Sequence, residues 1–188
     1  QRADNLEAYY RDKLKYKGPL YFDWDGDDPV TVAEEVHKLC VALELKGLDI
    51  ECAQLYATGG RGFHLEVPME CFLQKPPKDG MQFLPAVYRQ IAFDLAVEYL
   101  DFRVYSAGRG RMWRTINVQR ENKNYKGPIS YAELQAVDSA EVYKALCSQP
   151  RALPERKAPA LAMDLMVLFD RSQQEIADKL KKRGKRKT

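Results

Sequence analysis

The hydrophobic and polar positions along the chain follow two periods, an alternation typical of strands and a wider spacing typical of helices. The alternation is strictest in LYFDWD, where Phe22 and Trp24 share one face and the aspartates share the other. Two short apolar runs on either side of a glycine-rich turn predict a hairpin. The predicted strands are 20–25, 52–58, 62–67, 102–106 and 111–118.

Apolar residues at helical spacing fill most of the chain between and after these strands. Two of the predicted helices begin with a Ser/Thr-x-x-Glu pattern, Thr31–Glu34 and Ser130–Glu133, which is typical of a helix N-terminus. The predicted helices are 4–14, 30–46, 85–100, a segment that begins at Ser130, and 160–182. Together the elements predict an α+β fold, in which helices flank a small antiparallel sheet and a helical extension follows at the C-terminus.

The composition changes near the end of the chain. Three prolines in QPRALPERKAP predict a linker over 150–159. We therefore expect one compact domain over 1–149, because 188 residues with 45% hydrophobic content can bury one good core. The last segment, 160–188, is expected to form a basic helix and is a candidate start of a further domain.

The net charge of +3 is unevenly distributed. Residues 178–188 hold seven Lys/Arg and one Asp, so the rest of the chain is net negative and the basic surplus is local. The four cysteines form no Cys-x-x-Cys pair and there are only two histidines, so no structural zinc is expected. No apolar run approaches the roughly 20 residues of a membrane helix. We expect a cytoplasmic or nucleoid protein without membrane contact.

Four aspartates crowd the short run FDWDGDD. Asp23 and Asp25 lie on one face of the predicted strand with α-carbons about 6.5 Å apart, so they can share divalent cations. The crowding costs repulsion unless a cation is bound, although a solvated acidic turn is an alternative. Asp27 and Asp28 follow Gly26 and are interpreted as turn residues. An EF-hand loop is excluded because Gly26 is the fourth residue of the run and not the sixth.

The turn after the second predicted strand, TGGRG, carries three glycines in four positions and leads to a histidine. Glycines let backbone amides approach an anion closely, and Thr58, Arg61 and His64 can add hydrogen bonds and charge to a triphosphate. The alternative is a plain hairpin with a packed histidine.

Three stretches in order resemble the motifs of the archaeo-eukaryotic primase superfamily, the primase-polymerases. The first is the strand that ends in Asp23-x-Asp25, and the second is YATGGRGFHLEVP. The third, LDFRVYSAGRGRMWRTINVQRENKNYKGPIS, has an aspartate after a helix and then an arginine pair. The zinc-binding cluster of cellular primase small subunits is missing, which favours relatives from plasmids, phages and other mobile elements. Polymerase domains of bacterial end-joining ligases have a similar second motif, but the third stretch fits the primase-like branch better.

The resemblance implies a catalytic core with an RRM-like antiparallel sheet and an activity as a template-dependent DNA primase or polymerase. It implies two Mg²⁺ or Mn²⁺ ions held by Asp23, Asp25 and Asp101. The residues that it implies in nucleotide binding are Thr58, Arg61, His64, Arg111, Arg114, Asn117 and Lys126. The implied partners are a single-stranded DNA template, contacted by residues 120–126, and NTP or dNTP substrates. A helicase or a primer-binding helical domain, fused or in trans, is a further candidate.

Two other functions stay open. Haloacid-dehalogenase phosphatases also begin with an apolar strand that ends in Asp-x-Asp-Gly, but they have Thr or Val where this chain has Asp27, and a late acidic pair on a strand end. A non-catalytic module is the second alternative, in which the basic tail binds nucleic acid and the acidic cluster has no role in turnover.

Overall fold

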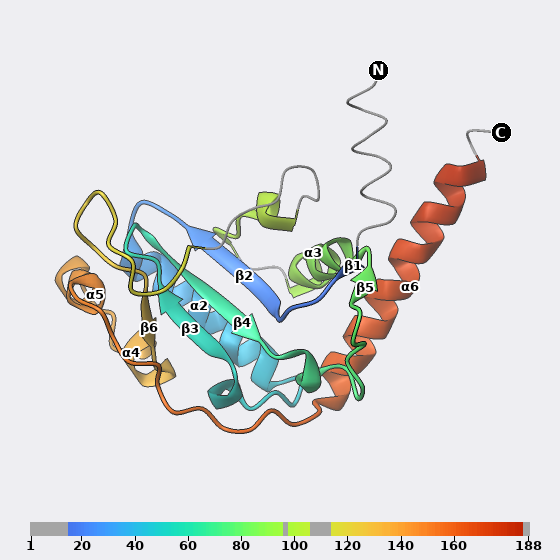
Figure 1. Ribbon diagram of the computed structural model, residues 1–188, viewed down its shortest axis with the longest axis horizontal. Helices are drawn as coiled ribbons and strands as arrows, with labels where there is room; N and C mark the ends of the chain where they lie inside the picture. Colours follow the sequence, from blue (N-terminus) through green and yellow to red (C-terminus); the bar gives the residue numbers. More distant parts are fainter. Residues whose placement is uncertain (1–14, 96–97, 106–113, 186–188) are drawn as a thin grey trace, which may run out of the picture.

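The computed structural model describes residues 15–95, 98–105 and 114–185 and has an α+β architecture (Figure 1). The predicted helix over 4–14 lies outside these residues. The strands are β1 (Lys15–Tyr16), β2 (Leu20–Asp25), β3 (Gln54–Ala57), β4 (Gly62–Val67), β5 (Met81–Gln82) and β6 (Gly127–Ile129). The α-helices are α2 (Pro29–Glu44), α3 (Leu84–Leu95), α4 (Tyr131–Gln135), α5 (Ala140–Cys147) and α6 (Met163–Lys185), and the 3-10 helices are η1 (Ile50–Cys52), η2 (Met69–Cys71) and η3 (Phe102–Tyr105).

Four strands form one antiparallel sheet in the order β2-β4-β3-β6, and β1 pairs separately with β5. The predicted antiparallel sheet and the hairpin of β3 and β4 are therefore confirmed. The register of β2 on β4 aligns Asp23 with His64 and Asp25 with Gly62. As a result, the acidic end of β2 and the glycine turn lie at the same end of the sheet.

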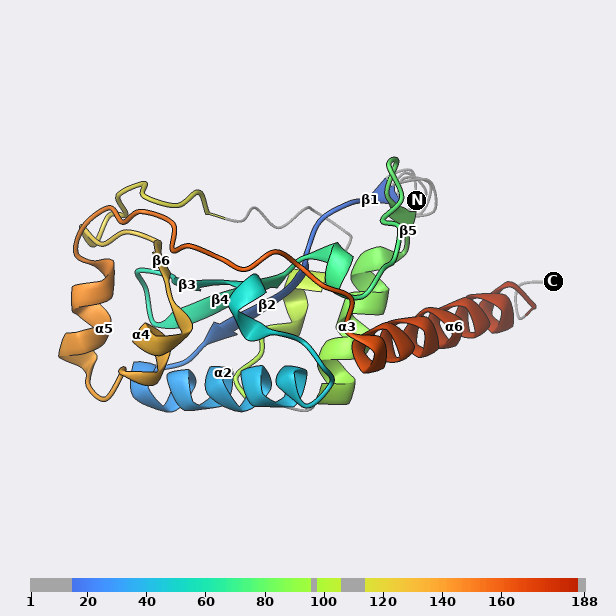
Figure 2. The ribbon, with the colours of Figure 1, turned by 90° about the horizontal axis from the view of Figure 1, so that it is seen from below.

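The core lies between the sheet and α2, which covers one face of the sheet (Figure 2). Strand alternation directs Leu20, Phe22 and Trp24 toward this core, and all three are fully buried. Burying a large apolar side chain stabilises a fold by about 1.5–3 kcal/mol. Asp23 and Asp25 point to the opposite face. The facing residues of α2 are Val32, Val36, Leu39, Cys40 and Leu43.

Helix α2 begins earlier than the predicted capping box. Asp28 is its N-cap, and the Asp28 carboxylate accepts hydrogen bonds from the backbone N–H groups of Val30 (3.2 Å) and Thr31 (3.1 Å). The Thr31 hydroxyl also donates to this carboxylate (2.6 Å), and this bond is the main cause that lowers the pKa of Asp28. The prediction that Thr31 caps the helix is wrong, because Pro29 already takes the first helical position.

The strand predicted over 102–106 is wrong, because residues 102–105 form the 3-10 helix η3. The Asp101 carboxylate accepts the backbone N–H of Arg103 (2.9 Å), and the Asp101 carbonyl accepts that of Val104 (3.2 Å). Such a side-chain bond to the following backbone favours a turn over an extended strand.

The strand predicted over 111–118 is also wrong in the part that the structure describes, 114–118, which forms a loop. Asn117 has a φ of 60°, in the left-handed region, and its backbone N–H donates to the Lys126 carbonyl (3.1 Å). Its side-chain amide donates to the Arg151 carbonyl (2.8 Å) and accepts the Arg151 N–H (2.9 Å). Asn117 therefore holds two segments of the chain together.

The predicted capping box Ser130–Glu133 is confirmed at the start of α4. Beyond α5, residues 148–162, here called the strap, run without helix or strand to α6 along one border of the molecule (Figure 1). Helix α6 starts at Met163 and not at 160, because the Ala162 N–H donates to the Cys71 carbonyl (2.8 Å) and keeps the chain extended.

Helix α6 packs against α3 and against Phe72, which follows η2. The rings of Phe72 and Phe169 lie 5.1 Å apart, and Arg171 pairs with Asp94 at 2.8 Å. In the part of the chain that the structure describes, no helix has the length and apolar character needed to cross a membrane.

Candidate functional site

A pocket of about 410 Å³ opens on the face of the sheet that α2 does not cover. It brings together the ends of β2 and β4, the segment at Asp101 and the chain before β6. The predicted site residues that line it are Asp23, Asp25, Thr58, Arg61, His64, Asp101, Arg114 and Lys126. Asn117 lies elsewhere, in its contact with the strap, and Arg111 is outside the described residues.

The carboxylates converge because the segment before η3 runs antiparallel to the free edge of β2. Trp24 and Leu100 form a β-bridge, and the Asp101 N–H donates to the Asp23 carbonyl (2.9 Å). The buried Glu35 of α2 accepts the Glu98 N–H (3.1 Å) and so fixes the start of this segment. The three predicted aspartates therefore line one pocket, although Asp101 is far from the other two in the sequence.

Two of the three aspartates are paired with cationic or imidazole groups. His64 Nε2 lies 3.0 Å from Asp23 Oδ1, and Arg103 contacts Asp101 Oδ1 through Nε (2.8 Å) and Asp101 Oδ2 through Nη2 (3.2 Å). Burial lowers the pKa of His64, although its bond to Asp23 acts in the other direction. This lowering favours the neutral imidazole at pH 7, in which Nε2–H donates to the Asp23 carboxylate.

The glycine turn is held together by the side chain of Thr58. The Thr58 hydroxyl oxygen accepts hydrogen bonds from the N–H groups of Gly60 and Gly62, each at 3.3 Å. The backbone N–H of Thr58 donates to the Gly62 carbonyl (3.0 Å). From α5, the Tyr143 hydroxyl donates to the same carbonyl (2.9 Å). Two of the amides that the sequence offers to an anion thus bind Thr58, and Thr58 organises the turn.

A loop around residues 119–125 clamps the glycine turn from outside. Arg120 donates to the Thr58 carbonyl (2.8 Å), and Asn122 donates to the Gly59 carbonyl (2.9 Å). Arg120 also lines the pocket, a position that sequence reasoning missed because it assigned the basic stretch to template contacts. Arg103 was missed as well. The sequence feature that could have identified it is its position two residues after Asp101, because a turn that starts at an aspartate directs that residue back toward the carboxylate.

The positive side of the pocket includes one buried ammonium group. Lys126 is only 2% exposed, its Nζ lies 4.1 Å from the centre of the Tyr56 ring, and burial lowers its pKa. The exposed Arg114 also lines the pocket, and Arg61 pairs with Asp27 at its rim. Arginine and lysine in such a concave site favour a ligand with several negative charges.

The aspartates have the donor chemistry that Mg²⁺ and Mn²⁺ prefer, since carboxylate oxygens are hard ligands. In the side-chain arrangement described, however, no three His, Cys, Asp or Glu groups come together as a metal-binding cluster within residues 15–95, 98–105 and 114–185. Asp23 contacts His64 in this arrangement, and Asp101 contacts Arg103. A divalent ion would have to replace at least Arg103.

Comparison of the chain with known protein families, curated proteins and solved structures finds no match.

Proposed function

We propose that this chain is a template-dependent DNA primase or polymerase, which binds a nucleoside triphosphate in the pocket and transfers nucleotides on single-stranded DNA. The observation that carries the proposal is the convergence of Asp23, Asp25 and Asp101 with Arg114 and Lys126 in one pocket. Nucleotidyl transfer needs both kinds of group in one site, because carboxylates hold the divalent ions and basic groups neutralise the phosphates.

Each side of the pocket has a separate task in this proposal. Asp23, Asp25 and Asp101 would hold Mg²⁺ or Mn²⁺ once Arg103 has left Asp101. Such ions, when bound, offset the negative charge of the triphosphate and the leaving pyrophosphate. The glycine turn supplies a rigid wall, because its backbone is tied to Thr58 and to the loop around residues 119–125.

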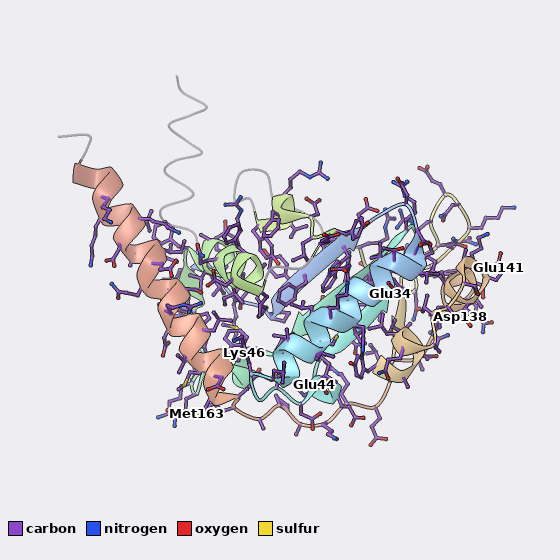
Figure 3. The ribbon with its side chains drawn as sticks, turned by 180° about the vertical axis from the view of Figure 1, so that it is seen from behind. Glu34, Glu44, Lys46, Asp138, Glu141 and Met163 are labelled. Carbon is purple, nitrogen blue, oxygen red and sulfur yellow. The ribbon has the colours of Figure 1, made fainter. Side chains whose placement is uncertain are left out.

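The charge distribution supports an approach of DNA from the pocket side. On the opposite side of the molecule lies α2, whose outer face carries Glu34 and Glu44 together with Lys38, and Lys46 follows the helix (Figure 3). These carboxylates repel a phosphate backbone, whereas Arg120 and Lys123 lie in the loop beside the pocket. Tyr125 in the same loop is available to stack on an unpaired base.

A non-catalytic nucleic-acid-binding module is a second candidate, and a specific observation favours it. The pairs Asp101–Arg103 and Asp23–His64 give two of the three carboxylates a partner other than a metal. The phosphatase alternative has less support, because it needs a late acidic pair on a strand end. The strand that follows Asp101 in the described part of the chain, β6, contains no acidic residue.

The experiment is nucleotide incorporation on single-stranded DNA, with and without a primer, comparing NTPs with dNTPs in Mg²⁺ and in Mn²⁺. The test variant is Asp23→Asn/Asp25→Asn, which keeps side-chain size but removes two charges. The matched control is Asp79→Asn/Asp138→Asn, which removes two charges from exposed positions outside the pocket. Thermal melts of all three proteins establish that they are folded.

Product from the wild type and the control, lost in the test variant, supports the proposal, and the lanes without primer show whether the protein initiates chains. If no protein makes product while all bind DNA equally, the binding module is correct. Hydrolysis of a simple phosphate monoester without template, lost in the test variant, would instead establish the phosphatase.

A further inference from the structure

Two of the four cysteines touch each other at the end of the β3–β4 hairpin that lies opposite the glycine turn. Cys52 in η1 and Cys71 in η2 are 2% and 0% exposed, and their sulfur atoms are 3.3 Å apart. The two residues meet because β3 and β4 are antiparallel, so η1 before β3 and η2 after β4 lie together. The pair lies outside the pocket described above.

We propose that Cys52 and Cys71 are an oxidation site, at which a small peroxide converts the two thiols into an intramolecular disulfide. A disulfide bond is about 2 Å long, so the sulfur atoms need to approach each other by little more than 1 Å. A pair of thiols in contact reacts as a unit, because the second thiol traps the oxidised form of the first before it oxidises further.

A route for the oxidant exists beside Cys52. This residue lines a cavity of about 630 Å³, whose wall also includes Met69, Arg156 and Lys157. Hydrogen peroxide is small enough to reach a recessed thiol through such an opening. The other two cysteines, Cys40 and Cys147, are also buried.

The two thiols have different roles in the reaction: one attacks the peroxide and the other attacks the sulfenic acid that results. The hydrogen bond with Cys71 lowers the pKa of Cys52, and the same bond raises the pKa of Cys71. Cys52 lines the cavity through which peroxide arrives, so it is the nucleophile: its thiolate attacks peroxide to give a sulfenic acid and hydroxide, which takes up a proton. The Cys71 sulfur then attacks the sulfenic sulfur, the S–S bond forms and water leaves. In total, two thiols and one hydrogen peroxide give one disulfide and two waters.

The bond would tie together two of the points that anchor the strap, which is also held at Arg151 by Asn117. The Lys157 N–H donates to the carbonyl of Glu51, next to Cys52 (3.2 Å), and the Ala162 N–H donates to the carbonyl of Cys71 itself (2.8 Å). Oxidation therefore joins both anchors covalently just before α6 begins, and opening of the strap becomes rarer.

In the test, the full chain is treated under native conditions with a small excess of hydrogen peroxide. Its peptides are then mapped by mass spectrometry without reducing the disulfides. We expect one cross-linked peptide pair, Cys52 with Cys71, and a mass lower by two hydrogens. The melting temperature should rise by roughly 5–10 °C, since closing a loop of this length restricts the unfolded chain. Amide hydrogen exchange at Lys157 and Ala162 should slow in the oxidised protein.

The control Cys40→Ala/Cys147→Ala retains the pair and should give the same cross-link and the same rise in melting temperature. Cys71→Ala should show neither effect, and Cys52 should accumulate sulfenic acid. A cross-link to Cys40 or Cys147, a disulfide between two chains, or unchanged masses after treatment would each overturn the proposal. Because the peptide map uses the wild-type chain, its outcome does not depend on the folding of any variant or on nucleotide transfer.

Discussion

Gly62→Ala tests the packing on which the candidate site depends. A β-carbon at Gly62 would lie 1.8 Å from the Trp24 carbonyl oxygen and 3.2 Å from the α-carbon of Asp25. These are backbone atoms of β2, so no side-chain rotation relieves the clash, and β4 must move away from β2 by more than 1 Å. Overpacking costs about 1–3 kcal/mol, and loss of two ladder hydrogen bonds adds about 2 kcal/mol.

The replacement also stabilises by about 0.4–1 kcal/mol, because alanine restricts the unfolded chain. The expected net loss is about 3 kcal/mol, which corresponds to a fall in melting temperature of roughly 6–12 °C. Urea unfolding measures the free energy directly. The matched control is Gly18→Ala, because a β-carbon at Gly18 would meet no atom within 4 Å.

If Gly62→Ala unfolds with a free energy within about 0.5 kcal/mol of the control, the close approach of β4 to the acidic end of β2 is refuted. The geometry of the pocket would then need to be revised, since Asp25 stands directly opposite Gly62 in the register.

Three further predictions concern the contacts that support the site. The bond from Lys38 lowers the pKa of Glu35. The stability that Glu35 contributes is therefore present above its ordinary pKa of 4.5 and is lost as the pH falls below it. Glu35→Gln should flatten the decline in unfolding free energy between about pH 5 and pH 3, which urea titrations at each pH measure. Tyr143→Phe keeps the ring but removes the bond to the Gly62 carbonyl, which retains the bond from the Thr58 N–H, so it should cost about 1 kcal/mol. An unchanged urea midpoint would show that this hydrogen bond does not stabilise the glycine turn. Asp28→Ala removes the N-cap of α2 and should cost about 1 kcal/mol; an equal loss in Asp28→Asn would show that the charge and not the cap matters.

Local patterns predicted the elements that form the floor of the site. The strict alternation of β2 indicated that Asp23 and Asp25 share a face, and the structure has Phe22 and Trp24 buried on the other. The apolar stripe of α2 indicated a helix because its buried residues recur at helical spacing on one face. Such elements follow from side-chain periodicity, which depends only on near neighbours in the chain.

The predictions failed where a single polar contact overrides the local preference. Residues 102–105 have strand-like composition, but bonds to the Asp101 carboxylate and carbonyl turn them into a 3-10 helix. Asn117 looks available in the sequence, but contacts with Arg151 engage its amide group. Only the folded structure showed that Arg103 and Arg120 line the pocket.

By itself, the sequence determined the α+β class, the face of β2 that carries the aspartates and the hairpin that carries His64. Only the tertiary structure decided that Asp101 lies beside Asp23, that Thr58 binds the amides of its own turn, and that Cys52 meets Cys71. The physical reason is the distance along the chain over which each kind of interaction acts. Periodicity and turn chemistry act over a few residues, whereas these contacts arise where strands and loops distant in the chain pack against one core, and packing selects among geometries that the local sequence permits equally.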